Sequence, residues 1–460
     1  MVADGKLIEL FDAGESDNGG VNIYDIGILD YYGESEELNL AVSKYNNQAD
    51  HVYFRVKEYK DKTSLNLALL SGENAMVITP NRFVLNNYVK QGFLASLEKL
   101  VPELFEENVL IENVVDAARV EGTSYYLPLN FELRVEAIAD PGLLKNGKLF
   151  ETRQEYYDFI TENDLEYFQK QTPGEILSSF VQNLDEWIDW ESNTAHFDDG
   201  TFETLLEFCN QGSTTEEVTE YMLQMFATTS QWGRDWKVSS FMLTDAVESY
   251  RFTDVEKALV YQQEISNMDG PEEGPTNWVQ VDFPMPSSVY DGYEIFAHNL
   301  YAVVDNEESK EAAGDLLKWL ILENVEEDFP EKETVPFLSM GWSGFSINRD
   351  ETDRYLRRLM NGYVDPEEEV AALSEESASI ASVVIAIRND AIVHNMKCGQ
   401  EQYEITWEYI HKADHLQYYQ NELFDVIHEE AGRYFSGMIT AKQAADYVQN
   451  RISIYLAEQG

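Results

Sequence analysis

Residues Gly122–Glu136 read GTSYYLPLNFELRVE, and this stretch decides how we expect the fold to be organised. The aromatic run Ser124–Leu127 predicts a short strand. Pro128 has no N–H for a sheet ladder, so the strand should end there or lie at a sheet edge. From Phe131 to Ala137 apolar and charged residues alternate, which is typical of a half-buried strand. A strand, a proline break and a second strand predict a chain that passes from one sheet into another. We therefore expect two lobes with a ligand site between them.

Length and charge limit the classes of function. A chain of 460 residues is too long for one compact core, so we expect two domains. The net charge of −53 argues against a nucleic-acid partner and against docking on anionic lipid, because both need clustered Lys and Arg. Cys209 and Cys398 form neither a disulfide framework nor a zinc motif. No nucleotide-binding loop or hydrolase motif is present, so we expect no cofactor, no metal and no catalytic residue.

The chain before the proline break alternates between strand and helix patterns. The predicted strands and helices, in order, are Val21–Leu29, 35–45, 52–56, Leu65–Leu70, Ala75–Thr79 and Phe83–Gly92. Such alternation is typical of βαβ units with a parallel sheet. Ligands of such sheets bind beyond the carboxyl ends of the strands, which places Asp30–Tyr32 and Pro80–Arg82 on the functional rim.

Two later segments also read as crossings between lobes, Val279–Met285 and Val335–Ile347. Between them we expect a strand over Phe296–Val304 and a helix over Ser309–Leu322. The last helix has a capping box formed by Thr440 and Gln443. The predicted boundaries are a polar tail at 1–20, a first lobe at 21–130 and 285–338, and a second lobe at 131–284 and 339–460.

The order and spacing of several segments resemble the extracellular solute-binding proteins of ABC importers, in the maltose-binding-like, carbohydrate-binding branch. The segments that carry the resemblance are Leu40–Tyr59, Leu69–Leu97, Val115–Leu144, His298–Leu320 and Gly437–Gln459. The last of these resembles the endings of Gram-positive lipoprotein members. Met76 and Thr123 depart from the family pattern, which usually has Asp and Lys there.

This resemblance implies an α/β, two-lobed, periplasmic-binding-protein-like fold of type II, in which each lobe is a mixed sheet flanked by helices and the lobes are joined by hinge crossings. It implies a monomer that captures a carbohydrate, most simply an oligosaccharide, and delivers it to ABC permease subunits. Members of the family are extracellular and often lipid-anchored. We therefore expect residues 1–20 to be the trimmed start of such a protein, with its signal peptide and lipidated Cys outside this sequence.

The resemblance also points to ligand-binding residues. Glu132 lies four residues after Pro128, where maltose-binding members carry a ligand-contacting Glu; the alternative is a solvated strand residue. Asn81 and Arg82 match a sugar-contacting Asp-Arg pair, with Asn in place of Asp. Arg82 could instead pair with a surface carboxylate.

Further candidates are aromatic or lie in the loop after the first strand. They are Asp30, Tyr31, Tyr126, Trp232, Trp236, Trp278, Trp342 and Tyr418. A plain turn is the alternative for Asp30 and Tyr31, and core packing is the alternative for the aromatics. We expect one or two of the four tryptophans to stack on a ligand.

Two other classes of function stay open at this point. A glycoside hydrolase would release sugar from glycans, which a binding protein cannot do. A surface interaction protein that kept the fold without a transport ligand would show no ligand-dependent stabilisation. Within the binding class, a peptide or a polyamine is an alternative to sugar.

Overall fold

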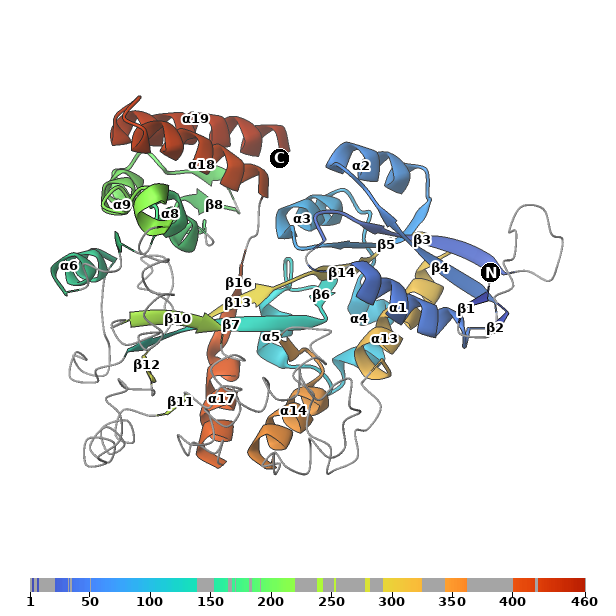
Figure 1. The fold of residues 1–460 in the computed structure, drawn as a ribbon. Coiled ribbons are helices and arrows are strands. Elements are labelled where there is room, and N and C mark those ends of the chain that lie inside the picture. The colour runs from blue at the N-terminus through green and yellow to red at the C-terminus, as the bar shows by residue number, and fades with distance from the viewer. Residues whose placement is uncertain are drawn as a thin grey trace.

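The computed structural model describes part of the chain, and all structural statements below concern that part. The described residues are 2–3, 6–7, 21–31, 33, 35–49, 51–138, 153–163, 168–169, 171–181, 184–190, 192–219, 238–242, 252–253, 278–281, 293–324, 344–361, 400–417 and 421–459. Figure 1 shows two sheets side by side, with β7 running from one toward the far end of the other.

The first sheet has five strands in the order β4-β3-β5-β14-β6. Its strands are β3 (Asn22–Ile28), β4 (Val52–Glu58), β5 (Asn74–Thr79), β6 (Tyr126–Pro128) and β14 (Leu300–Val303). β3 pairs in parallel with both β4 and β5, which confirms the predicted βαβ arrangement. β14 is antiparallel to β5 and β6, so the sheet is mixed. β6 ends at Pro128 on the sheet edge, as its missing N–H requires.

Helices follow these strands where local signals place them. The helices of this part are α1 (Ser35–Asn46), α2 (Lys62–Leu70), α3 (Arg82–Lys90), α4 (Leu97–Leu100), η1 (Pro102–Phe105), α5 (Glu112–Ala117) and α13 (Lys310–Leu322). Asp61 caps α2 by accepting a hydrogen bond from the backbone N–H of Ser64 at 2.8 Å. The expected helices of this region are therefore confirmed, each within a few residues.

The second sheet is built around the nine-residue β7 (Asn130–Ile138). Seven described strands belong to it: β7 with β10 (Val238–Met242), β11 (Phe252–Thr253), β12 (Trp278–Val281), β13 (Tyr293–Ala297), β15 (Phe345–Ser346) and β16 (Ala413–Leu416). β10, β12, β13 and β15 are antiparallel to β7, while β16 is parallel to β13. The sheet thus joins chain segments from four separated regions, near residues 130–138, 238–297, 345–346 and 413–416.

The remaining described helices lie above and below the second sheet in Figure 1, while the β1–β2 hairpin lies on the side of the first sheet near the N-terminus. The helices are α6 (Arg153–Asn163), α8 (Pro173–Phe180), α9 (Thr201–Cys209), α14 (Arg349–Asn361), α17 (Gln400–Lys412), α18 (Asn421–Phe435) and α19 (Ala441–Gln459). Short hairpins are formed by β1 (Val2–Ala3) with β2 (Lys6–Leu7) and by β8 (Ile188–Asp189) with β9 (Thr194–Ala195). The capping box of α19 is confirmed: the Thr440 hydroxyl accepts from the Gln443 N–H, and the Gln443 side chain accepts from the Thr440 N–H.

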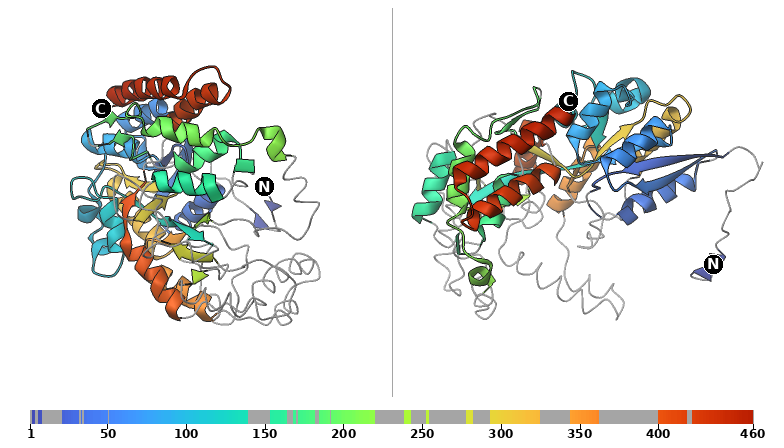
Figure 2. Two further views of the ribbon diagram at one scale, coloured as in Figure 1. Left: turned by 90° about the vertical axis from the view of Figure 1, so that its left-hand side faces the viewer. Right: turned by 90° about the horizontal axis from the view of Figure 1, so that it is seen from above.

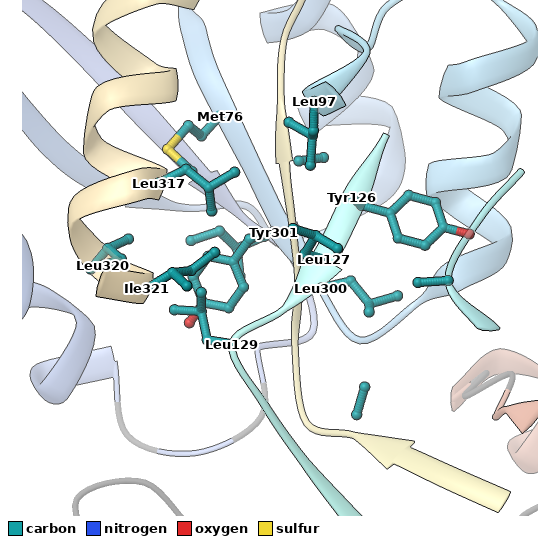
Figure 3. Packing of buried hydrophobic residues seen from close by; sticks show 14 of the residues in the cluster. Met76, Leu97, Tyr126, Leu127, Leu129, Leu300, Tyr301, Leu317, Leu320 and Ile321 are labelled. Carbon is teal, nitrogen blue, oxygen red and sulfur yellow. The ribbon is translucent and has the colours of Figure 1, made fainter. Parts of the chain in front are cut away.

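Two apolar cores hold these elements. The sheet core packs against the first sheet and continues to β7, β13 and β16, and it includes Met76, Leu133 and Leu416. Figure 3 shows part of it, with Met76, Leu317 and Tyr301 on one side of β6 and Tyr126 pointing to the other. The helical core joins α6, α8, α9, α18 and α19 around the buried Trp187, and it includes Phe83 from α3.

One predicted strand is wrong in its extent. The run over Phe296–Val304 forms two strands in two sheets, because β13 pairs with β7 while β14 pairs with β5. The chain therefore crosses between the sheets at His298 and Asn299. The predicted first lobe includes residues 285–338, and this is wrong for residues 293–297, which lie in the second sheet. β14 is buried on both faces, so the apolar run shows no change of pattern that marks the break between the two strands. The full assignment of residues to two lobes stays a proposal.

Candidate functional site

Two crossings between the sheets lie next to each other. Pro128 of β6 pairs with Leu300 of β14, and Phe131 of β7 pairs with Ala297 of β13. The segment from β6 to β7 therefore passes between the sheets around Leu129. The segment from β13 to β14 passes beside it, around His298–Asn299. We call this region the junction. Polar side chains at the junction lie where the two sheets meet. The sequence predicts a ligand site between two such parts of the chain.

α3 places Arg82 beside the junction. Asn81 follows β5 at its carboxyl end and caps the helix, because its Oδ1 accepts a hydrogen bond from the Val84 N–H at 3.0 Å. Asn81 is 6% exposed, and its role within the fold is to cap α3 and so to position the next residue, Arg82. Ligand contact by Asn81 stays a prediction.

The structure brings two of the candidate site residues, Arg82 and Tyr126, together, and their contact with a ligand stays a prediction. The Arg82 Nε–H donates to the Tyr126 hydroxyl at 3.1 Å, and its Nη1–H donates to the backbone carbonyl of Leu416 at 2.9 Å. The Tyr126 hydroxyl in turn donates to Asn86 Oδ1 at 2.7 Å. Arg82 thus joins α3 and β6 of the first sheet to β16 of the second.

Asp185 and Trp190 are members of this site that sequence reasoning missed. The Trp190 indole N–H donates to Asp185 Oδ1 at 2.6 Å. Burial raises the pKa of the Asp185 carboxyl, while this hydrogen bond and the positive charges of Arg82 and His415 oppose the rise. The only sequence signal was that Trp190 falls in a tryptophan-containing segment, and no motif connected it to Arg82. Their proximity depends on a tertiary contact.

Glu132 is buried at the start of β7. It is 2% exposed, so the alternative of a solvated strand residue is wrong. Its neighbours come from β13, where Phe296 is its register partner, and from Gly344 just before β15. A side chain on Gly344 would bring Cβ to 3.3 Å from Glu132 Cγ and to 2.6 Å from the Phe131 carbonyl oxygen. The carboxylate therefore lies in a closely packed part of the second sheet.

Asp30 and Tyr31 follow β3, the neighbour of β5 in the first sheet. Asp30 is exposed with a left-handed φ of 52°, which fits the plain-turn alternative. Burial and the nearby Glu422 raise the pKa of its carboxyl. The Tyr31 side chain packs inward on the sheet core, where burial raises its pKa and its hydroxyl interacts with that of Tyr301. A ligand role for either residue stays a prediction.

The remaining predicted site residues cannot be placed. Trp232, Trp236, Trp342 and Tyr418 lie outside the described residues, and Trp278 lies in β12, where only the backbone is described. Within the described ranges, no group of three or more His, Cys, Asp or Glu side chains could hold a metal ion. A search of the same ranges finds no helix long and apolar enough to cross a membrane.

The comparisons with known proteins point to one fold. The galacto-N-biose/lacto-N-biose I-binding protein of the ABC transporter from Bifidobacterium longum superposes with a TM-score of 0.50 at 13% identity, over 96% of this chain and 98% of its own. The chain has the fold of ABC-transporter solute-binding proteins. The resemblance read from the sequence is therefore confirmed at the level of the fold.

Two further structures are similar at lower scores. The maltose/maltodextrin-binding domain from Bdellovibrio bacteriovorus bound to maltotriose has a TM-score of 0.46 at 11% identity, over 95% of this chain and 100% of its own. The cyclic alpha-maltosyl-1,6-maltose binding protein from Arthrobacter globiformis has a TM-score of 0.44 at 12% identity, over 95% and 100%. These neighbours are binding proteins rather than enzymes. No family model and no curated protein matches the chain.

Proposed function

We propose that this protein is an extracellular solute-binding protein that captures a carbohydrate at the junction and delivers it to an ABC permease. The bound solute is an oligosaccharide, and the protein performs no covalent chemistry on it. Two lobes close around the ligand by a hinge motion at the crossings, with the predicted boundaries except that residues 293–297 belong to the second lobe. The protein acts as a monomer anchored by lipid to the outer face of the cell membrane.

The observation that carries this proposal is the polar group at the junction. Arg82 and Tyr126 supply a guanidinium and a phenol that are hydrogen-bonded beside one crossing, and Glu132 supplies a buried carboxylate next to the Phe131–Ala297 pair of the other, within a solute-binding fold. Sugar hydroxyls are recognised by planar donors and acceptors of these kinds, and the C–H faces of a sugar ring stack on aromatic side chains. The structural neighbour from Bifidobacterium longum holds lacto-N-biose, which supports a carbohydrate as the ligand.

A thermal-shift screen of the purified protein tests the ligand class. The panel contains mono- and oligosaccharides, with peptides and polyamines as controls. A ligand that binds only the folded state at a hundredfold excess over its Kd stabilises it by about 2.7 kcal/mol. A shift with sugars alone supports the proposal, and a shift with peptides or amines alone overturns the sugar. Chromatography of the incubated glycans then checks for release of smaller sugars, which would indicate a glycoside hydrolase instead.

Variants of Glu132 and Arg82 test the position of the site. Glu132→Gln removes a charged acceptor, and Arg82→Lys removes the planar fork of donors. We expect each to weaken binding of the sugar found in the screen by about tenfold or more, measured by isothermal titration calorimetry. Glu58→Gln, at an exposed strand position in β4, is the matched control and should bind like the wild type. Unchanged affinity in both site variants would show that the site lies elsewhere.

A further inference from the structure

Phe83, near the start of α3, packs in the helical core rather than in the sheet core. It is 2% exposed and belongs to the helical core, with its ring centroid 5.7 Å from that of Trp190 and 6.3 Å from that of Tyr455. The next residues of α3, Val84 and Leu85, pack in the sheet core instead. One helix thus contributes side chains to both cores, and Phe83 is the residue that crosses over.

Polar contacts lie on either side of this aromatic group. Arg82, next to Phe83, donates to the Leu416 carbonyl at 2.9 Å. On the other side, Glu422 at the start of α18 interacts with the Tyr455 hydroxyl and lies within electrostatic reach of Asp30 and Lys62 from the first sheet. Figures 1 and 2 show the C-terminal end of α19 beside α3 in each view. These contacts join α3 to β16 through Arg82, and to Trp190 and α19 through Phe83.

We propose that Phe83 is an interlobe latch, which holds the two lobes together in the absence of ligand by occupying the aromatic site made by Trp190 and Tyr455. Opening the lobes withdraws Phe83 from this site and breaks the Arg82–Leu416 hydrogen bond with it. The ring is almost fully removed from water in the latched state, so opening re-exposes apolar surface on both sides. The latch rests on the two hinged lobes of the proposed function, but it does not depend on what the ligand is.

The size of the effect follows from the burial of one aromatic side chain. Truncating Phe83 to alanine removes most of the apolar surface that closes this contact. The population of open molecules should then rise on the order of 30-fold relative to the wild type. Leu85 provides the matched control, because it is fully buried on the same helix but packs only within the sheet core.

Distance measurement by electron paramagnetic resonance without ligand tests the latch. Spin labels are placed at Leu67→Cys in α2 and Met438→Cys between α18 and α19, which are 64% and 74% exposed. Cys209→Ala and Cys398→Ser remove the native thiols, and circular dichroism confirms that each labelled variant is folded. We expect one main distance for the latched protein and a longer second distance in Phe83→Ala. Trp190→Ala should produce the same second distance.

Two further variants keep the proposal falsifiable. Phe83→Leu retains an apolar side chain and should give the longer distance in a smaller fraction of molecules, which covers the case in which Phe83→Ala fails to fold. Leu85→Ala should lower the melting temperature while keeping the wild-type distance. An unchanged distance in both Phe83 variants, or an equal change in Leu85→Ala, would overturn the latch. Because no sugar is present, this result is independent of the outcome of the ligand screen.

Discussion

Replacing Arg82 by alanine should destabilise the protein through the loss of two hydrogen bonds and of a positive charge near Asp185. The guanidinium donates two hydrogen bonds, to Tyr126 and to Leu416, and its charge opposes the rise in the pKa of the buried Asp185 carboxyl. Hydrogen bonds that involve a charged group contribute about 1.5–3 kcal/mol each, and Arg82 is partly exposed, which places both near the lower end. We therefore expect Arg82→Ala to lower the free energy of unfolding by about 4 kcal/mol at pH 7.5, of which about 3 kcal/mol comes from the two hydrogen bonds and about 1 kcal/mol from the lost charge near Asp185.

A double-mutant cycle separates the share that depends on Asp185. In Asp185→Asn the buried carboxylate is absent, so removing Arg82 leaves no uncompensated negative charge. Arg82→Ala should then cost only its two hydrogen bonds, about 3 kcal/mol, which gives a coupling of about 1 kcal/mol between the two residues. The measurement is urea unfolding followed by circular dichroism, and additive effects within about 0.3 kcal/mol would refute the reasoning.

The pH dependence provides a second check on the same pair. An Asp whose folded pKa is raised binds protons more readily in the folded state, so stability falls as pH rises through that pKa. Loss of Arg82 raises the pKa of Asp185 further, because it removes an opposing positive charge. The cost of Arg82→Ala should therefore be smaller at pH 5 than at pH 7.5. Lys442→Ala, at an exposed ion pair in α19, controls for the loss of one positive charge and should cost under about 0.5 kcal/mol at either pH.

Three further substitutions test other parts of the structure. Asn113 donates from Nδ2 to the carbonyls of Ile410 and Ala413, both at 2.6 Å, so Asn113→Leu should cost about 2 kcal/mol in urea unfolding; a cost below about 0.5 kcal/mol would contradict this role. Gly344 has a φ of 107° and no room for Cβ, so Gly344→Ala should lower the melting temperature by several degrees, at a cost of about 2 kcal/mol or more. Burial lowers the pKa of His298 to about 4. Stability should therefore fall as pH drops from about 6.5 toward 4, by about 2 kcal/mol after allowance for partial exposure, and this loss should disappear in His298→Gln.

Local signals along the chain predicted the elements of the first sheet correctly. The alternation of strand and helix before Gly92, the break at Pro128 and the capping box at Thr440 each depend on residues within one or two turns of each other. Backbone sterics and capping hydrogen bonds act at this short range. The position of Arg82 at the carboxyl end of β5 was also accessible, because ligands of parallel sheets bind beyond that end, but its pairing with Tyr126 was not.

The partners of the buried side chains were decided only by the tertiary structure. The hydrogen bond from Arg82 to Leu416 joins residues 334 positions apart. The burial of Glu132, the placement of Phe83 in the helical core and the division of Phe296–Val304 between two sheets arise in the same way. A sequence pattern reports how much of a side chain is buried but not what buries it, because apolar contact is non-directional. The order of the elements can therefore be inferred from neighbouring residues, whereas the contents of the junction depend on which distant segments the fold brings together.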